Sequence, residues 1–446
     1  MRKKPDITPP ENILPRTLDL IEQKRKYELI TPLYGGGVEA NKPDPVTIVR
    51  ATEIRGQLRF WWRAMRGGQA EGDPPLKTRE DEIWGKAYEK GDTGIPQEQT
   101  IQIIVDADPS RRGKAIKPFE IQRRRPKSIN GIPDYAAFPL QPDQKELQKS
   151  QPSIPDLWEG ICFTLTITYP ACLSKEIEAA LWAWETFGGL GARTRRGFGA
   201  LHLLEINGAS YQSLPTSRDV ERWIQDEARK HSKGGSFPIG LPHLSGEIQF
   251  AVTSPTNNPI LAWNTLIKKL QDFRQQKDVN RRSAWPEADT IREVAGTGSA
   301  SQIQKFPRAA FGLPIIFHFT GNNAPAGNYT LNETETERKD RQNKERFASP
   351  LILRPLLCSD KQAVGLALLL EGSRVELNNL VLQDDSKDKK VQKVNGTSTL
   401  NGVLDSAEAR AIAHKSSGSQ DGKDALRVLR NETDVLQAFM KFCKGV

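Results

Sequence analysis

The chain has 446 residues, with 64 Lys or Arg against 55 Asp or Glu, which gives a formal net charge of +9 and a pI near 9.2. Its 37% content of hydrophobic residues excludes a chain that is disordered throughout, and at roughly 150 residues per domain the length predicts about two or three domains. The apolar run at 363–370 is far shorter than the roughly 20 residues that span a bilayer, so no membrane helix is expected.

The first residues, MRKKPDITPPENILP, are basic but are followed by no apolar stretch, so they do not resemble a secretory signal. We therefore expect a cytoplasmic protein. No CxxC or HExxH pair occurs, so the sequence predicts neither a metal site nor a disulfide framework, and no cofactor. The cysteines are at 162, 172, 358 and 443, and the histidines are at 202, 231, 243, 318 and 414.

The N-terminal part of the chain predicts a strand, a turn and an amphipathic helix. Residues 26–33 alternate as a strand does and run into three consecutive glycines. A helix is predicted to begin near Thr52 as N-cap. Its apolar residues Ile54, Leu58, Trp61 and Met65 share one face, and Arg55, Arg59, Arg63 and Arg66 share the neighbouring face. A further strand is predicted at 100–105.

The middle of the chain carries the strongest predictions. Residues 106–154 lack periodicity and predict a long loop or insertion. Residues 161–169 alternate regularly and predict a strand, and Ser174 is a candidate N-cap for a helix with apolar residues at 177, 181, 184 and 187. The glycine-rich string GGLGARTRRGFG follows at 188–199, and a last strand is predicted at 200–206.

This order of strand, helix and strand, given twice, predicts a ferredoxin-like sheet. A second unit is expected after a connection near 231–245. Its predicted strands are 246–253, 313–319, 349–357 and 363–370, and its predicted helices are 261–273 and 424–442. The sequence therefore predicts an α+β protein with two ferredoxin-like domains in tandem, at 1–230 and 231–446, with long insertions.

Positive charge is concentrated in three segments. Residues 50–66 hold five arginines and one acid, 111–127 hold eight cations and one acid, and 188–199 hold three arginines and no acid. Nucleic acid is the common polyanion that binds such clusters, because each phosphate that they neutralise releases counterions. The segment 111–127 equally fits a solvated loop.

The glycine-rich string does not fit a nucleotide-cofactor site, because those glycines precede a helix whereas these follow one. The alternative is that the glycines let the backbone approach a sugar-phosphate chain, while Arg193, Arg195 and Arg196 supply charge and Phe198 stacks on a base. Gly188 or Gly189 fits a helix C-cap, and Phe198 fits a core position equally well.

These motifs resemble a known family. GGLGARTRRGFGAL at 188–201 is similar to the glycine-rich signature of the RAMP superfamily of CRISPR proteins. TPLYGGG at 31–37 and EIRGQLRFWWRAMRGG at 53–68 resemble, more narrowly, the Cmr-type RAMP subunits numbered first in the type III-B effector complex. The likeness covers about residues 26–206. FPRAAFGLPIIF and RFASPLILRPL are similar less securely, and 111–155 and 380–420 match nothing.

The resemblance implies two RAMP domains, which are RRM-like, in an assembly with other Cmr subunits, CRISPR RNA and target RNA. It also implies a binding subunit that holds the 3′ region of the guide and has no catalytic role. Two alternatives remain open: a metal-independent endoribonuclease, with His202 or His231 as acid or base, and a protein-docking scaffold. The predicted RNA-binding residues are Gly35, Gly36, Gly37, Arg50, Arg55, Arg59, Arg63, Arg66, Gly189, Gly191, Arg193, Arg195, Arg196 and Phe198.

Overall fold

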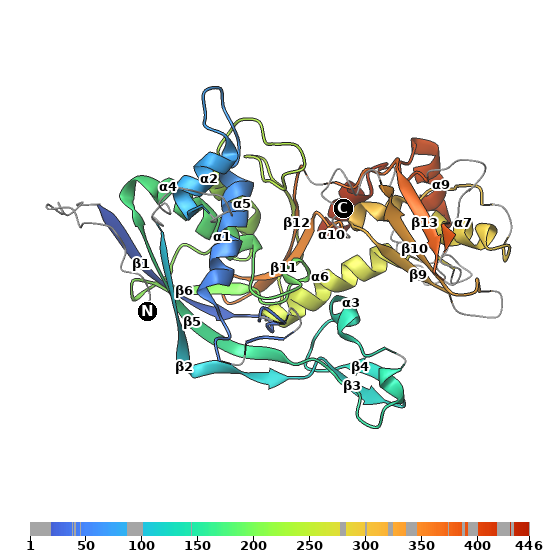
Figure 1. The fold of residues 1–446 in the computed structure, drawn as a ribbon, viewed down its shortest axis with the longest axis horizontal. Coiled ribbons are helices and arrows are strands. Elements are labelled where there is room, and N and C mark those ends of the chain that lie inside the picture. The colour runs from blue at the N-terminus through green and yellow to red at the C-terminus, as the bar shows by residue number, and fades with distance from the viewer. Residues whose placement is uncertain are drawn as a thin grey trace, which may run out of the picture.

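The computed structural model describes most of the chain. The described residues are 19–86, 101–276, 282–298, 301–319, 324–335, 346–385, 389–390, 400–416, 429 and 432–445, apart from 38, 40, 41, 45, 144 and 373. Helices and strands are both abundant, which confirms the predicted α+β class (Figure 1). No helix in these ranges is long and apolar enough to cross a membrane.

A five-stranded antiparallel sheet organises the N-terminal half. Its strands are β1 (Leu20–Leu29), β2 (Gln102–Ile116), β5 (Leu157–Pro170), β6 (Leu201–Ile206) and β7 (Ala209–Ser210). Their order in the sheet is β2-β5-β1-β6-β7. Helices α1 (Ala51–Arg66) and α4 (Ser174–Phe187) pack against each other over one face of this sheet. Leaving out the short β7, this is the order and direction of the ferredoxin-like arrangement that the sequence predicts.

The buried face of β5 shows why these residues form this sheet. Alternate residues Ile161, Phe163, Leu165, Ile167 and Tyr169 are all buried, in agreement with the predicted alternation. In α1 the apolar spacing likewise holds, since Ile54, Leu58, Trp61 and Met65 are buried. Two predicted caps are wrong: the N-cap of α1 is Arg50 and that of α4 is Leu173, because each helix begins one or more residues off the predicted position.

The predicted loop at 106–154 is wrong for much of its length. β2 continues to Ile116 and pairs with β5, and a hairpin of β3 (Phe119–Gln122) and β4 (Arg125–Ser128) follows. The sequence did not show this because the strand is solvent-exposed and lacks an apolar face. The shorter elements of the N-terminal half are α2 (Leu76–Trp84), α3 (Asp134–Ala137) and α5 (Val220–His231).

The C-terminal half contains a three-stranded antiparallel sheet of order β11-β12-β8. Its strands are β8 (Gln249–Val252), β11 (Leu351–Leu357) and β12 (Ala363–Leu369). Helices α6 (Pro259–Arg274) and α10 (Val435–Lys444) pack on it. In the described residues no fourth strand joins this sheet. The predicted pair of complete ferredoxin-like domains is therefore not confirmed.

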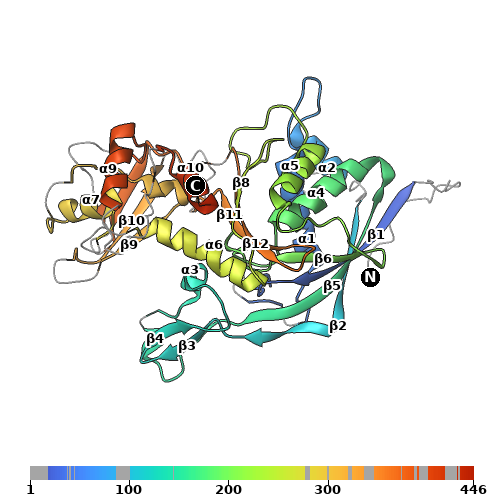
Figure 2. The ribbon, with the colours of Figure 1, turned by 180° about the vertical axis from the view of Figure 1, so that it is seen from behind.

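A separate module is inserted into this half. It contains the four-stranded sheet β14-β13-β10-β9, which has its own hydrophobic cluster and lies at one end of the molecule (Figures 1 and 2). Its elements are β9 (Ile315–His318), β10 (Asn328–Glu333), β13 (Leu380–Asp384), β14 (Lys389–Lys390), α7 (Pro286–Val294) and α9 (Ser406–Ser416). The remaining core is one cluster that runs through both halves, so the boundary at 230 stays a prediction.

Candidate nucleic-acid interface

The two glycine segments of the sequence meet in the structure. We call residues 31–37 and 188–199 together the glycine junction. The amide of Ala192 donates to the carbonyl of Tyr34 at 2.6 Å, and that of Gly199 donates to Pro32 at 2.9 Å. The Glu53 carboxylate of α1 accepts from the amide of Gly191. The two motifs, which are far apart in the sequence, therefore lie in direct contact.

The close approach in this junction is between two segments of the protein itself. A Cβ atom on Gly191 would lie well under 3.0 Å from the carbonyl oxygen of Tyr34, and the backbone there has φ +78°. Gly35 and Gly189 are buried, whereas Gly36 and Gly37 are partly exposed and accept from the guanidinium of Arg50. Glycine is thus required by chain packing, whether or not RNA also approaches.

Three of the α1 arginines are paired with carboxylates. Arg59 and Arg63 both reach Glu80 of α2, with the Nη2 of Arg59 at 2.8 Å and the Nη1 of Arg63 at 2.5 Å from one oxygen. Arg66 pairs with Glu176 of α4 at 2.6 Å. Burial alone would raise the pKa of Glu176, but the bonds from Arg66 and Trp62 outweigh it and lower that pKa. These arginines therefore bind the helices together.

Arg55 completes this face of α1 without a carboxylate. Its guanidinium donates to the carbonyls of Trp84, at 3.1 Å, and Ile101, at 2.7 Å. Burial lowers its pKa, and the neighbouring Arg59 adds to the effect. The predicted free strip of four guanidinium groups is therefore not present: its members are used in contacts with α2, α4 and the start of β2.

We expect Glu80→Gln to lower the free energy of unfolding by about 2 kcal/mol. The Glu80 side chain is buried, and its charge-assisted hydrogen bonds to Arg59 and Arg63 are each worth about 1.5–3 kcal/mol. Glutamine recovers part of this loss, because a neutral amide costs less to bury than a carboxylate. Urea unfolding of the two proteins measures the difference. Glu221→Gln, an exchange of the same kind at an exposed position on α5, is the control. A loss below 0.5 kcal/mol, on the order of a surface exchange, would contradict this assignment.

The arginines of the glycine junction differ from those of α1 because all of them bind carbonyl oxygens. Arg193 Nε donates to Ala136 at 3.0 Å, and Arg196 Nη1 donates to Leu351 at 3.0 Å. Arg195 donates to Ser349. In the described ranges none of the three lies within 4.0 Å of a carboxylate, so this segment keeps its positive charge. Burial, followed by the like charges of Arg274 and Arg193, lowers the pKa of Arg196 to about 9, which still leaves it charged at pH 7.

Phe198 requires a correction. Its side chain is 0% exposed and packs edge-on against Trp263 of α6 at 4.9 Å between ring centroids. A base cannot stack on a ring enclosed in this way, so the prediction of a stacking platform is wrong and Phe198 is a core residue. The sequence already gave an indication of this, because residues 198–203 are mostly apolar, as at the start of a buried strand.

A second cationic surface was missed as a site by sequence analysis. We call the exposed residues Arg112, Arg123, Arg124 and Arg125 the basic arm. They lie on β2 and at the β3–β4 hairpin, and in the described part of the chain no carboxylate lies within 4.0 Å of any of them. Other cations nearby are compensated: Arg111 pairs with Glu28 at 3.1 Å and Lys117 with Asp156 at 2.8 Å. The local charge excess was visible in the sequence, but the hairpin that exposes it was not.

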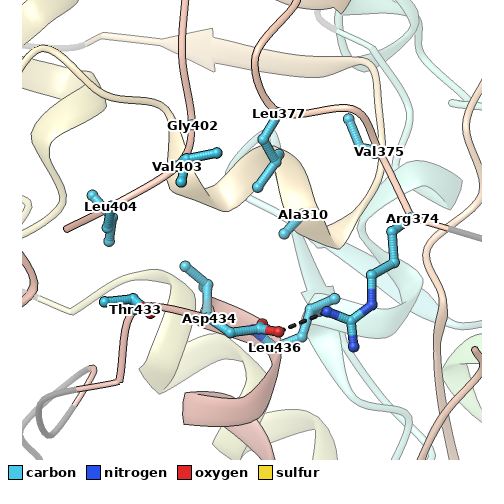
Figure 3. Close-up of a pocket in the computed structure, with 11 residues that line it drawn as sticks. Ala310, Arg374, Val375, Leu377, Gly402, Val403, Leu404, Thr433, Asp434 and Leu436 are labelled. Atoms are coloured by element: carbon cyan, nitrogen blue, oxygen red, sulfur yellow. Dashed lines mark hydrogen bonds and ion pairs between the residues drawn. The ribbon is translucent and has the colours of Figure 1, made fainter. Parts of the chain in front are cut away.

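An apolar pocket of about 220 Å³ lies elsewhere, between η5 (Pro307–Phe311), the segment after β12 and the start of α10. Figure 3 shows that two of its lining residues, Arg374 and Asp434, form an ion pair, with 2.6 Å between their charged atoms. Because this pair neutralises itself and Val375, Leu377 and Leu436 line the rest, the pocket offers no net charge to a nucleic acid. No cluster of metal-ligating side chains occurs among the residues described.

Comparison with known proteins identifies the domain that carries the glycine junction. The family model of the RAMP superfamily matches residues 26–202, which include the end of β1, all of α1, β5 and α4, and the whole glycine junction. This segment is a RAMP-superfamily domain. The resemblance inferred from its motifs is confirmed.

The relatives of this RAMP domain include Cmr subunits. Over 181 residues the chain is 24% identical to CRISPR system Cmr subunit Cmr1-2 of Pyrococcus furiosus, which covers 39% of this chain and 90% of that protein. The crystal structure of apo Cmr1 from Pyrococcus furiosus is 17% identical, with a TM-score of 0.44, over 78% of this chain and 88% of that one. A chain of the type III-B Cmr-beta complex bound to cognate target RNA is 12% identical, with a TM-score of 0.45, over 80% and 96%.

Proposed function

We propose that this chain is a non-catalytic RNA-binding subunit of a type III-B CRISPR (Cmr) effector complex. It would act in the cytoplasm with other Cmr subunits and contact the 3′ region of the guide RNA, the target RNA or both. The RAMP match and the sequence likeness to a Cmr1 protein support the assembly. We further propose that the C-terminal unit is a second, incomplete RAMP-like domain.

One observation carries the RNA-binding proposal: among the residues that the structure describes, the arginines of the glycine junction have no carboxylate partner. Arg193, Arg195 and Arg196 hold three positive charges close together, which is unfavourable in a partly buried site unless an anion is near. A phosphate backbone supplies that anion, and guanidinium groups bind it with forked donors. In this proposal the α1 arginines hold α1 against α2 and α4, and the junction arginines contact RNA.

We expect the purified chain to bind single-stranded RNA with strong salt dependence. If about six phosphates are contacted, the slope of log affinity against log salt is near −4. Fluorescence anisotropy of a labelled RNA across a salt series measures it, and Arg195→Gln is expected to reduce the slope by about 0.7. A slope near zero would remove the proposal. If the chain instead captures Cmr subunits without binding RNA, it is a docking scaffold.

The absence of catalysis is also a proposal. His231 Nε2 lies 3.1 Å from Glu227 and its ring stacks on Trp182, which gives this histidine a structural role. Burial lowers the pKa of His202, on β6, so that little of it is protonated and able to act as an acid at pH 7. Incubation of precursor RNA with the chain in EDTA is expected to leave the RNA intact. Defined fragments with 2′,3′-cyclic phosphate ends would establish the ribonuclease instead.

A further inference from the structure

The β3–β4 hairpin has an unusual turn. Gln122 pairs with Arg125, so the loop consists of two residues, Arg123 and Arg124. Both have positive φ, at 50° and 58°, which is the geometry of a type I′ turn. Such turns favour Asn-Gly, because other residues cost roughly 1–2 kcal/mol each in this conformation. Stability of the turn therefore does not explain why arginines are found there.

The charges of this turn are not compensated. Arg123, Arg124 and Arg125 are exposed, and in the described ranges none lies within 4.0 Å of a carboxylate. The acid on the hairpin, Glu120, lies 3.7 Å from Lys127 instead. Three adjacent guanidinium groups repel one another, and this repulsion is relieved when they bind an anion. Backbone strain and uncompensated charge are thus two independent destabilising effects at Arg123 and Arg124.

The hairpin is anchored well enough to present these groups. Phe119 at its base is 1% exposed and belongs to the main core. Lys117 donates to the carbonyl of Ile154 at 2.7 Å, and Asn130 donates to Lys117 at 3.0 Å, so both ends of the hairpin are tied down. The cations therefore project from a fixed element.

The chemistry of the surface fits a phosphate chain. The hollow beside the turn is lined by Gln122, Arg123, Arg125 and Lys127, which offer donors and positive charge but no apolar or aromatic face. An apolar peptide or an unstacked base would find nothing to pack on there. In Figures 1 and 2 the hairpin stands at the far end of β2, on the opposite side of α6 from α1 and α4. It is therefore separate from the α1 arginines.

We propose that the β3–β4 hairpin is a second RNA-contact site, in which Arg123, Arg124 and Arg125 grip the ribose-phosphate backbone without reading base sequence. This inference rests on the proposed function, because it assumes that the chain binds RNA. The hairpin adds a specific element outside the glycine junction. It also accounts for the positive φ angles of Arg123 and Arg124, since the two-residue turn leaves both side chains exposed.

The test replaces the two turn residues by those the turn prefers. Arg123→Asn with Arg124→Gly removes two charges while keeping or raising the stability of the hairpin. At about 0.1 M salt the affinity of the full chain for single-stranded RNA is expected to fall about tenfold, and the salt slope to shrink by about 1.4. The thermal midpoint is expected to stay the same or rise, which separates lost binding from lost folding.

A matched control removes the same charge elsewhere. Arg222→Gln with Arg229→Gln changes two exposed arginines of α5 that are paired with Asp219 and Asp226. Their loss is expected to alter affinity less than twofold. An equal fall in both double variants would mean that only net charge matters, and the hairpin site would be rejected.

The outcomes separate this proposal from the proposed function. If the wild-type chain binds RNA with a steep salt slope and the Asn-Gly variant binds equally well, the hairpin proposal is overturned and the proposed function stands. If the wild-type chain does not bind RNA, both fall. If the variant keeps its RNA affinity but loses an acidic Cmr subunit, the hairpin is a protein-docking surface and the RNA assignment is wrong.

Discussion

Replacing Arg354 by methionine is expected to lower the free energy of unfolding by about 3–5 kcal/mol. Arg354 lies on β11 in the C-terminal half and is 1% exposed. Its guanidinium donates to the carbonyls of Glu185 and Gly188, both at 2.8 Å, and of Leu201 at 2.7 Å. Methionine fills part of the space but leaves these three buried carbonyl oxygens without donors, and each unsatisfied acceptor costs roughly 1–3 kcal/mol. Part of this cost is offset because a charged group no longer has to be buried.

Urea unfolding followed by tryptophan fluorescence measures this loss. Arg374→Met is the matched control, because Arg374 is exposed and its ion pair with Asp434 is worth at most about 1 kcal/mol. Arg354→Lys keeps the charge but cannot reach three carbonyls at once, so an intermediate loss is expected. If the methionine variant lost less than the Arg374 control, Arg354 would have no role in joining the two halves.

The glycine junction and Arg354 together explain how the two halves are joined. Arg354 reaches from β11 to the end of α4, where the helix dipole favours a cation. In the other direction Arg195 and Arg196 reach the carbonyls of Ser349 and Leu351 at the start of β11, and the indole nitrogen of Trp263 donates to Arg196 at 2.7 Å. The glycine-rich string of the RAMP domain therefore holds β11 and α6 of the C-terminal unit by hydrogen bonds, and it is also the proposed RNA contact.

Much of the fold was predictable because it depends on local periodicity. The alternation at 161–169 fixes the face of β5, and the apolar spacing in α1 and α4 fixes the sides that pack on the sheet. The predicted order of strands and helices, combined with antiparallel pairing, gives the order of the strands within the sheet. The strand that was missed, the second half of β2, is exposed and charged, so it carries no apolar pattern to read.

The candidate site was only partly predictable, because the partner of a charged residue is a long-range property. Nothing near Arg59 or Arg66 in the sequence indicates that Glu80 and Glu176 will neutralise them. The contact between the two glycine motifs was not predicted either, because one follows β1 and the other follows α4, and their meeting is again a long-range property. The turn at Arg123 was hidden for the opposite reason: it lacks the glycine or asparagine by which such turns are recognised.

The glycine junction also gives the other large expected effect, from Gly199→Ala. Gly199 has φ +61°, and a Cβ atom there would lie far under 3.0 Å from the carbonyl oxygen of Leu190, with the Leu190 backbone nitrogen at 3.1 Å. The Leu190 amide donates to Gly199 at 3.0 Å, so the two segments cannot separate without breaking the junction. We expect a loss of about 4 kcal/mol or more, from the backbone conformation and the clash together.

Gly208→Ala separates these two causes. Gly208 has φ +79°, but a Cβ atom there would meet nothing within 4 Å. This variant should therefore show the cost of the left-handed backbone alone, about 1–2 kcal/mol. Urea midpoints of the two variants and the wild type give the difference, which measures the clash inside the junction. Equal losses in both variants would mean that Leu190 moves aside freely, and the junction would then be too pliant to hold Arg193, Arg195 and Arg196 in fixed positions.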